Sequence, residues 1–258
     1  MQLSTVHPVT VAVLLIASGC ASFGEAALPA PAPSTDRGAA PPPNILLILV
    51  DDLGWMDLAC QGNRLIDTPN IDRLARQGMR FTDAYAAAPV CSPTRAAILT
   101  GQSPARLHLT THLPGGFVAE GSKLLPAKIL PHLPLEHETI AERLRKSGYR
   151  TALLGKWHLA SKGDPEQGLK KEAFFPKAQG FHLNIGGCHY GGPPTFFDPY
   201  RIPTLPDRQA GEYLPDRLAD EAIAFIGADQ AKPFMLFLWN YAVHWPMEAK
   251  AEMLQKYA

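Results

Sequence analysis

The sequence has no excess of charge of either sign, few cysteines and no apolar run long enough to cross a membrane. Its 258 residues hold 24 Lys and Arg against 24 Asp and Glu, which excludes a strongly basic surface for nucleic acid. The four cysteines include no CxxC pair, so neither a disulfide scaffold nor a structural zinc site is predicted. Cys60 and Cys188 are interpreted as buried free thiols, with a disulfide between them as the alternative. A hydrophobic content of 46% excludes a chain disordered throughout and predicts one sizeable core.

The apolar run near the start, Val9 to Ser18, has the length of the hydrophobic part of a signal peptide and is too short to span a bilayer as a helix. We therefore predict a signal peptide over residues 1–27. The residues that end at Cys20 read Ala-Ser-Gly-Cys and resemble a bacterial lipoprotein signal, in which a lipid on Cys20 is the only membrane contact. Ordinary cleavage between Ala21 and Ala27 is the alternative. In both cases the mature protein is exported, and we expect it in the periplasm, on the outer membrane or outside the cell.

Residues 28–43 are predicted to form a linker and residues 44–258 the folded part. The linker holds six prolines among Ala, Ser and Gly, a composition that favours extended, hydrated backbone. In the folded part, strand-like apolar runs follow segments with helical spacing, which predicts an α/β fold with a mostly parallel central sheet flanked by helices. Residues 160–210 are rich in Gly, Pro and aromatics and predict a long loop region. The predicted strands are 44–50, expected to be buried on both faces, 149–154 and 234–239, and the predicted helices are 70–77, 92–99, 138–147 and 216–226.

Two carboxylates follow the first predicted strand. Asp51 and Asp52 stand directly after Val50, and ligands of open α/β sheets collect at the carboxyl ends of the strands. Adjacent carboxylates repel each other unless a cation lies between them, and hard oxygen donors suit Ca²⁺ or Mg²⁺. On this pair alone two interpretations stay open: a metal site, or one aspartate that caps the next turn beside one that is solvated.

A cysteine stands at the start of a predicted helix. The amides at a helix N-terminus favour negative charge, and Arg95 lies about one turn after Cys91 on the same side. An ionised nucleophile or a bound anion would be stabilised there. From the residues alone, Cys91 could be a thiolate of low pKa, the nucleophile of a cysteine phosphatase loop, or a buried cysteine that only packs.

Several motifs occur in a fixed order along the chain. Residues 43–54 combine the first strand with the Asp pair, residues 68–75 read TPNIDRLA, and Cys91-Ser-Pro-Thr-Arg95 is followed by Leu-Thr-Gly. Residues 155–159 read GKWHL, and residues 234–246 end in His-Trp-Pro. A CxPxR match alone is a weak signal, but the ordered set is specific. Together these segments resemble the formylglycine-dependent sulfatases, a branch of the alkaline phosphatase superfamily, over nearly all of residues 43–258.

The resemblance implies that a separate formylglycine-generating enzyme oxidises Cys91 to formylglycine, whose aldehyde hydrates to a geminal diol. One diol oxygen attacks sulfur, and the second hydroxyl lets the sulfated intermediate collapse and release sulfate. Asp51, Asp52 and the modified Cys91 become ligands of a divalent metal, for which Ca²⁺ is expected. The implied activity is the hydrolysis of sulfate esters, on a sulfated small molecule or a polysaccharide outside the cell.

The resemblance also implies roles for four further residues. Arg95 holds the modified residue, and Lys156 contacts both the diol and a sulfate oxygen as a fixed positive charge. His158 takes the proton of the second hydroxyl during collapse. His244 binds the sulfate and assists departure of the alcohol as a general acid.

Two other functions stay open. The first is hydrolysis of phosphate or phosphonate esters, by enzymes of the same superfamily that use the same metal site. The second, of a different class, is a non-catalytic remnant that binds anionic glycans. The remaining metal ligands of the family, an Asp followed by an Asn or His, lie in a later segment, and no such pair occurs in this sequence. We therefore expect the chain to be the N-terminal part of a longer protein, with more strands and a small C-terminal domain after Ala258. This part alone is expected neither to fold stably nor to turn over substrate.

Overall fold

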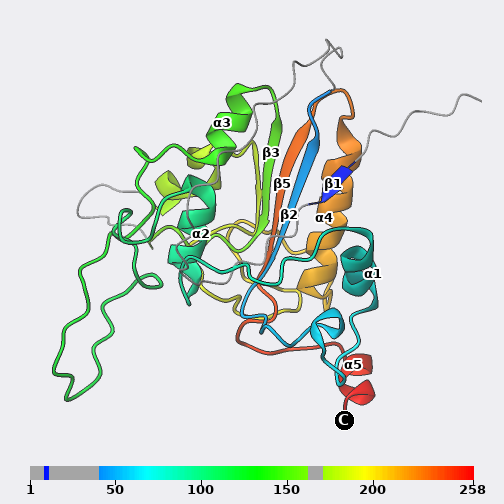
Figure 1. The fold of residues 1–258 in the computed structure, drawn as a ribbon, viewed down its shortest axis with the longest axis horizontal. Helices are drawn as coiled ribbons and strands as arrows, with labels where there is room; N and C mark the ends of the chain where they lie inside the picture. The colour runs from blue at the N-terminus through cyan, green and yellow to red at the C-terminus, as the bar shows by residue number, and fades with distance from the viewer. Residues whose placement is uncertain (1–8, 12–40, 162–170) are drawn as a thin grey trace, which may run out of the picture.

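A computed structural model describes residues 9–11, 41–161 and 171–258, and its centre is a five-stranded sheet in which neighbouring strands are parallel (Figure 1). The strand order is β1-β2-β5-β3-β4. Parallel strands need crossover connections, which place helices on the faces of the sheet. The predicted α/β fold with a parallel central sheet is therefore confirmed. The strands are β1 (Val9–Val11), β2 (Asn44–Val50), β3 (Arg150–Gly155), β4 (Leu183–Ile185) and β5 (Phe234–Asn240).

Helices cover both faces of the sheet, with α2 and α3 on one side and α4 on the other (Figure 1). The start of α3 is a capping box, in which the side chains of Thr139 and Glu142 each accept a hydrogen bond from the backbone N–H of the other. α2 is followed by Gly101, whose φ of +68° is the left-handed conformation in which glycine commonly ends a helix. The helices are α1 (Pro69–Gln77), α2 (Cys91–Thr100), α3 (Ile140–Lys146), α4 (Leu214–Ala228) and α5 (Ala251–Lys256), with short 3-10 helices η1 (Ala59–Gln61), η2 (Lys171–Phe174) and η3 (Pro176–Gln179).

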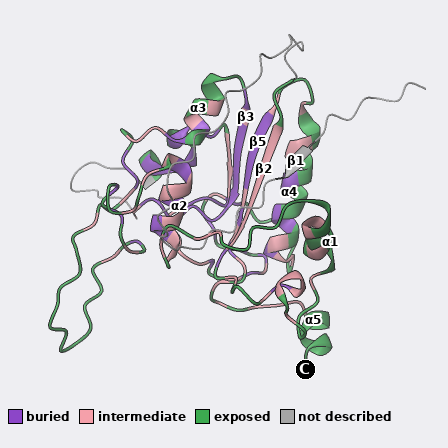
Figure 2. Ribbon diagram, viewed as in Figure 1, coloured by how far each residue is buried: buried purple, intermediate pink, exposed green. Residues whose placement is uncertain are grey.

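The predicted strands and helices are all present, and no end is displaced by more than two residues. One expectation is wrong: the sequence predicts that β2 is buried on both faces, but every residue of β2 is half-buried (Figure 2). The physical reason is its place in the sheet. β2 has β5 on one side but only the three-residue β1 on the other, whereas β5 lies between two longer strands and is mostly buried.

The region predicted as a long loop, residues 160–210, contains short regular elements. β4 pairs with β3, with Leu183 opposite Ala152, and η2 and η3 precede it. A strand of three residues is too short to show an alternating pattern in the sequence. Residues 162–170 of this region lie outside the described residues.

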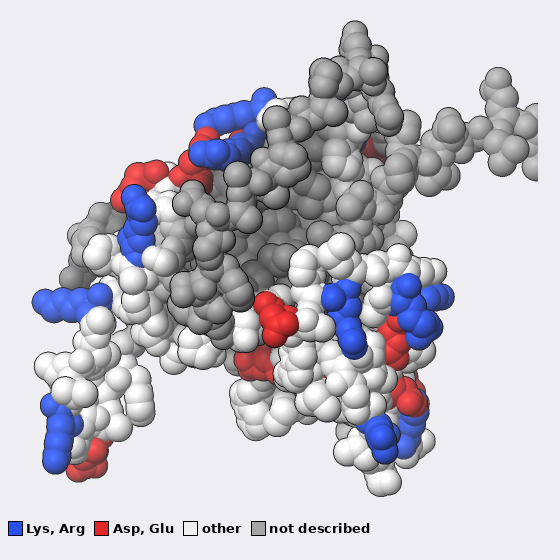
Figure 3. All heavy atoms as spheres, viewed as in Figure 1, with Lys and Arg blue, Asp and Glu red and all other residues white. Residues whose placement is uncertain are grey.

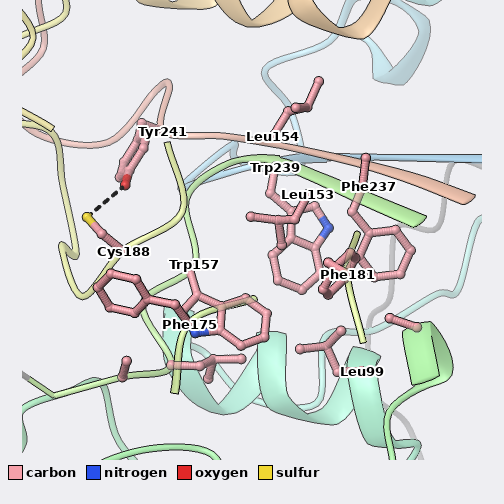
Figure 4. Close-up of a cluster of buried hydrophobic side chains, with 14 of the residues drawn as sticks. Leu99, Leu153, Leu154, Trp157, Phe175, Phe181, Cys188, Phe237, Trp239 and Tyr241 are labelled. Atoms are coloured by element: carbon pink, nitrogen blue, oxygen red, sulfur yellow. Dashed lines mark hydrogen bonds between the residues drawn. The ribbon is translucent and has the colours of Figure 1, made fainter. Parts of the chain in front are cut away.

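The two largest fully buried side chains, Trp157 and Trp239, belong to an aromatic layer between the sheet and α2 (Figure 4). Trp157 and Trp239 stack with ring centroids 6.4 Å apart, and Phe237 stacks on Trp239 at 5.1 Å. Leu99 of α2 is buried beside them. Aromatic side chains bury large apolar areas in fixed geometries, so this layer sets the position of α2 relative to β3 and β5.

Of the predicted signal peptide, residues 1–27, the structure describes only Val9–Val11, which pairs with β2 as an edge strand. The rest of that segment, with Cys20, and residues 28–40 of the linker lie outside the described residues, so cleavage and lipidation remain predictions. No helix in the described part of the chain is both long and apolar enough to cross a membrane. On the face shown in Figure 3, basic and acidic side chains lie side by side, in keeping with the balanced charge.

Candidate active site

The predicted site residues meet at the carboxyl edge of the sheet. Asp51 and Asp52 follow β2, Lys156 and His158 follow β3, and His244 follows β5. These three strands are neighbours and parallel, and their carboxyl ends therefore lie at the same edge, where ligands of open α/β sheets bind. The start of α2 reaches this edge as well, because the aromatic layer holds the helix against the sheet.

Asp51 is the centre of a buried cluster of charges. Its Oδ1 accepts a hydrogen bond from Arg95 at 2.9 Å, and its Oδ2 accepts one from Lys156. Burial alone would raise the pKa of Asp51, but the two cations outweigh it and hold the pKa below its usual value. Burial, followed by the charge of Arg95, lowers the pKa of Lys156. With two cations and one carboxylate, the cluster has a surplus positive charge that favours an anionic group nearby.

Arg95 is held on three sides. Besides Asp51, its guanidinium donates to the carbonyl of Lys156 at 3.2 Å and lies 5.0 Å from the ring centroid of Trp239. Its described hydrogen bonds therefore go to Asp51 and Lys156. The contact of Arg95 with the modified Cys91 stays a prediction.

Cys91 and His158 form a close pair beside this cluster. The Sγ of Cys91 is 3.2 Å from Nδ1 of His158, and Nε2 of the same ring is 2.8 Å from the carbonyl oxygen of Leu113. A carbonyl oxygen only accepts, so Nε2 carries the hydrogen and Nδ1 presents a lone pair to Cys91. Burial, helped by the charge of Lys156, lowers the pKa of His158 to about 3. The ring is therefore neutral near pH 7, with its Nδ1 lone pair directed at residue 91.

His244 lies at the outer side of the site. Its Nε2 is 3.8 Å from Oδ2 of Asp52, and its Nδ1 is 2.8 Å from the carbonyl oxygen of Trp245. That carbonyl fixes the hydrogen on Nδ1 and leaves Nε2 directed toward Asp52. The His244 side chain is 26% exposed, which lets it meet a group that arrives from solvent.

One contact that the sequence does not predict is the packing of Gly191–Gly192 against both histidines. A Cβ on Gly191 would lie 2.7 Å from Cε1 of His158, and a Cβ on Gly192 would lie 2.9 Å from Nδ1 of His244 and 2.5 Å from the carbonyl oxygen of Trp245. Only glycine permits backbone to approach the two rings this closely. The Gly-Gly pair within the predicted loop region was the signal that could have pointed to this contact.

The predicted metal ligands line one cavity. Asp51, Asp52 and Cys91 all border a cavity of about 290 Å³, and carboxylate oxygens are the donors that Ca²⁺ prefers. The donor type therefore fits, but the number does not, since Ca²⁺ takes roughly six to eight oxygen ligands. Both oxygens of Asp51 already contact cations, and the described ranges contain no group of three or more His, Cys, Asp or Glu side chains placed to hold a metal. The described residues alone therefore do not complete a cation site.

The other described thiols are apart from these groups. Cys60 and Cys188 form no disulfide with each other, in keeping with the favoured interpretation, and Cys188 is buried next to Tyr241. Cys60 is only half-buried, so its predicted burial is wrong. The reason is that it lies in η1 at the surface, where its backbone N–H binds Asp72 and its carbonyl accepts from the exposed Arg80.

Comparison with known proteins agrees with this geometry. The sulfatase family model matches residues 43–258. N-acetylgalactosamine-6-sulfatase of Mus musculus is 34% identical over 84% of this chain and 43% of its own length, and arylsulfatase A of Homo sapiens is 45% identical over 60% of this chain and 27% of its own length. The crystal structure of Ps i-CgsB in complex with k-i-k-neocarrahexaose superposes with a TM-score of 0.66 and 30% identity, over 83% of this chain and 48% of that chain.

The chain thus spans less than half the length of these relatives, and its match to the family model runs from the start of β2 through α5. The matched span contains the charge cluster, the Cys91–His158 pair and His244. On the family match and this geometry together, the chain belongs to the sulfatase family.

Proposed function

We propose that the protein is a sulfuric ester hydrolase that uses a formylglycine made from Cys91. One observation carries the proposal: the Sγ of residue 91 lies 3.2 Å from Nδ1 of the buried His158. A buried cluster with surplus positive charge lies beside this pair. A nucleophile, a proton acceptor and a charge that stabilises an anion therefore occur together, as covalent transfer of a sulfuryl group requires.

The residues of this chain have the following roles in the proposed reaction. Hydrated formylglycine supplies a hydroxyl nucleophile in place of the thiol, so Cys91 Sγ marks the position of the reacting oxygen. His158 accepts, at Nδ1, the proton of the second hydroxyl of the diol. Lys156 and Arg95 supply positive charge that stabilises the anionic groups at residue 91 and on the sulfate. His244, when protonated, donates from Nε2 to the departing alcohol.

We further propose that Asp51, Asp52 and the modified Cys91 hold Ca²⁺ together with additional ligands. When bound, the cation would neutralise the carboxylates and acidify an oxygen on residue 91. The role of this chain is to direct Asp51 and Asp52 into the shared cavity and, through Arg95 and Lys156, to keep Asp51 ionised.

Sulfated carbohydrates are the substrates we propose. The relative from Mus musculus is an N-acetylgalactosamine-6-sulfatase, and the crystal structure of Ps i-CgsB contains k-i-k-neocarrahexaose. Export, which the sequence predicts from residues 1–27, would bring the enzyme to polymers outside the cell. A formylglycine-generating enzyme is the partner required during maturation.

The test is mass spectrometry of the protein from its own host, followed by kinetics. The tryptic peptide Phe81–Arg95 should show the mass loss that replacement of a thiol by an aldehyde produces, and the same preparation should hydrolyse an aryl sulfate faster than the matching aryl phosphate. Faster turnover of the phosphate would instead support a phosphate or phosphonate ester hydrolase. An intact thiol together with no turnover of either ester would support a glycan-binding remnant.

The Gly191–Gly192 contact gives a prediction about kinetics. Gly191→Ala should lower kcat by about 10- to 100-fold, because displacement of His158 by a fraction of an ångström to 1 Å spoils its alignment. The new Cβ would lie 2.7 Å from the ring. Steady-state kinetics on an aryl sulfate would measure the change.

A matched control is Gly227→Ala in α4, where an added Cβ meets nothing within 4 Å. It should leave kcat unchanged and raise stability slightly, since alanine is the better helix former. Equal kcat values for Gly191→Ala and the unsubstituted protein would contradict the positioning role of Gly191.

A further inference from the structure

Ser92 stands next to Cys91 in α2, and the proposed chemistry does not use it. Its side chain is fully buried, and it is not among the residues that border the cavity with Cys91. It therefore contacts neither substrate nor cation in the proposed site. A buried hydroxyl needs hydrogen-bond partners, and the partners of Ser92 identify what it does.

Both hydrogen-bonding capacities of the Ser92 hydroxyl are used, and both lead to His158. The hydroxyl donates to the backbone carbonyl of His158 at 2.8 Å and accepts from the backbone N–H of Leu113 at 3.0 Å. The carbonyl of the same Leu113 is the group 2.8 Å from Nε2 of His158. Ser92, Leu113 and His158 thus form a closed ring of hydrogen bonds, and all three residues are buried.

This ring fixes two properties of His158. The carbonyl of Leu113 keeps the hydrogen on Nε2, so the lone pair on Nδ1 is the one that faces Cys91 at 3.2 Å. The bond from Ser92 to the His158 carbonyl also holds a backbone with φ of +54°, which is uncommon for a residue with a side chain. Without the hydroxyl, the Leu113 N–H and the His158 carbonyl would be buried and unpaired, and the loop that carries Leu113 would lose its tie to α2.

We propose that Ser92 is a positioning residue, which sets the tautomer and place of His158 through Leu113; the inference rests on the proposed function for its kinetic consequence. Ser92, the residue after the modified cysteine, then contributes to turnover independently of the conversion of Cys91 to formylglycine. This contribution comes from the hydroxyl of Ser92, which holds both Leu113 and the His158 carbonyl.

The test compares Ser92→Ala, Ser92→Thr and Thr100→Ala in the full protein. Thr100 is the control because it lies in the same helix and its hydroxyl binds the carbonyl of Ala96 at 2.8 Å, away from His158. For Ser92→Ala we expect kcat per formylglycine-bearing molecule to fall about 100-fold and KM to fall with it, so that kcat/KM, which is set by formation of the sulfated intermediate, stays within about twofold. The sulfated form of the Phe81–Arg95 peptide should accumulate during turnover, because a misplaced His158 slows release of sulfate. Ser92→Thr keeps the hydroxyl and should recover most of kcat, and Thr100→Ala should match the unsubstituted protein.

Nitrogen NMR of histidine in the unsubstituted protein gives a readout that needs neither activity nor a variant. His158 should show hydrogen on Nε2, and hydrogen on Nδ1 would overturn the inference. Normal kcat per modified molecule in a folded Ser92→Ala protein would overturn it as well. Absence of formylglycine from the unsubstituted protein counts against the proposed function instead, and a comparison of the His158 tautomer in Ser92→Ala with that in the unsubstituted protein still tests the role of Ser92.

Discussion

Replacing Cys91 with alanine in the protein made by its own host should abolish turnover of sulfate esters and leave the fold intact. Without a side chain that can become formylglycine there is no nucleophile, and we expect kcat to fall by at least about 10⁴-fold, the range seen when a covalent catalyst loses its nucleophile. Cys91 is half-buried, and its described side-chain contact is with His158. Loss of this small side-chain group at position 91 should therefore change the free energy of unfolding little. Activity on an aryl sulfate and thermal unfolding of the same preparation would be measured together.

The matched control is Cys60→Ala, which removes a free thiol from η1. This variant should keep full activity. If Cys91→Ala retained turnover while Cys60→Ala behaved normally, residue 91 could not be the nucleophile and the proposed mechanism would be wrong.

Replacing Asp51 with asparagine should give the largest loss of stability among single substitutions in the site. Arg95 and Lys156 are almost fully buried, and Asp51 is the carboxylate that both contact. Neutralising it leaves two like charges buried without their partner. Removal of one partner from a buried ion pair typically costs about 3–5 kcal/mol, so the free energy of unfolding should fall by that amount. Urea unfolding would be measured with a chelator present, so that loss of a bound cation cannot account for the difference.

The control for this experiment is Asp67→Asn. Asp67 pairs with Lys256 at 2.7 Å, but its side chain is 68% exposed, and such surface pairs contribute about 0–1 kcal/mol. A loss for Asp51→Asn no larger than that of Asp67→Asn would show that the buried cations do not depend on Asp51.

The sequence could predict the positions of those site residues that directly follow a strand or lie one turn apart on a helix. Asp51 follows an uninterrupted apolar strand, and Arg95 lies one helical turn after Cys91, so periodicity alone brings these residues toward one edge of the sheet. The resemblance added Lys156, His158 and His244. Their assembly around Asp51 and Cys91 could be anticipated from order along the chain, but the partner of each atom could not.

The contacts that escaped prediction connect segments far apart in the chain through backbone atoms. The carbonyl of Leu113 meets His158 from an irregular segment with no periodic pattern, and Gly191 approaches the same ring from the predicted loop region. Carbonyl groups are present at every residue, so no residue type signals which one will fix a tautomer. The half-burial of β2 was missed for a related reason, because an apolar run shows that a strand suits burial and does not show which strand lies beside it.

The position of β5 in the sheet determines when the ion pairs around Asp51 can form during synthesis. β5 is the last strand of the described chain, yet it lies between β2 and β3. Asp51 and Lys156 follow those two outer strands, so they are held at contact distance only after residues 234–240 have been inserted between them. Such a late, long-range closure is typical of slow folding. A nascent chain shorter than about 240 residues would contain Asp51, Arg95 and Lys156 with their charges still in water, and their burial would follow as one late cooperative step.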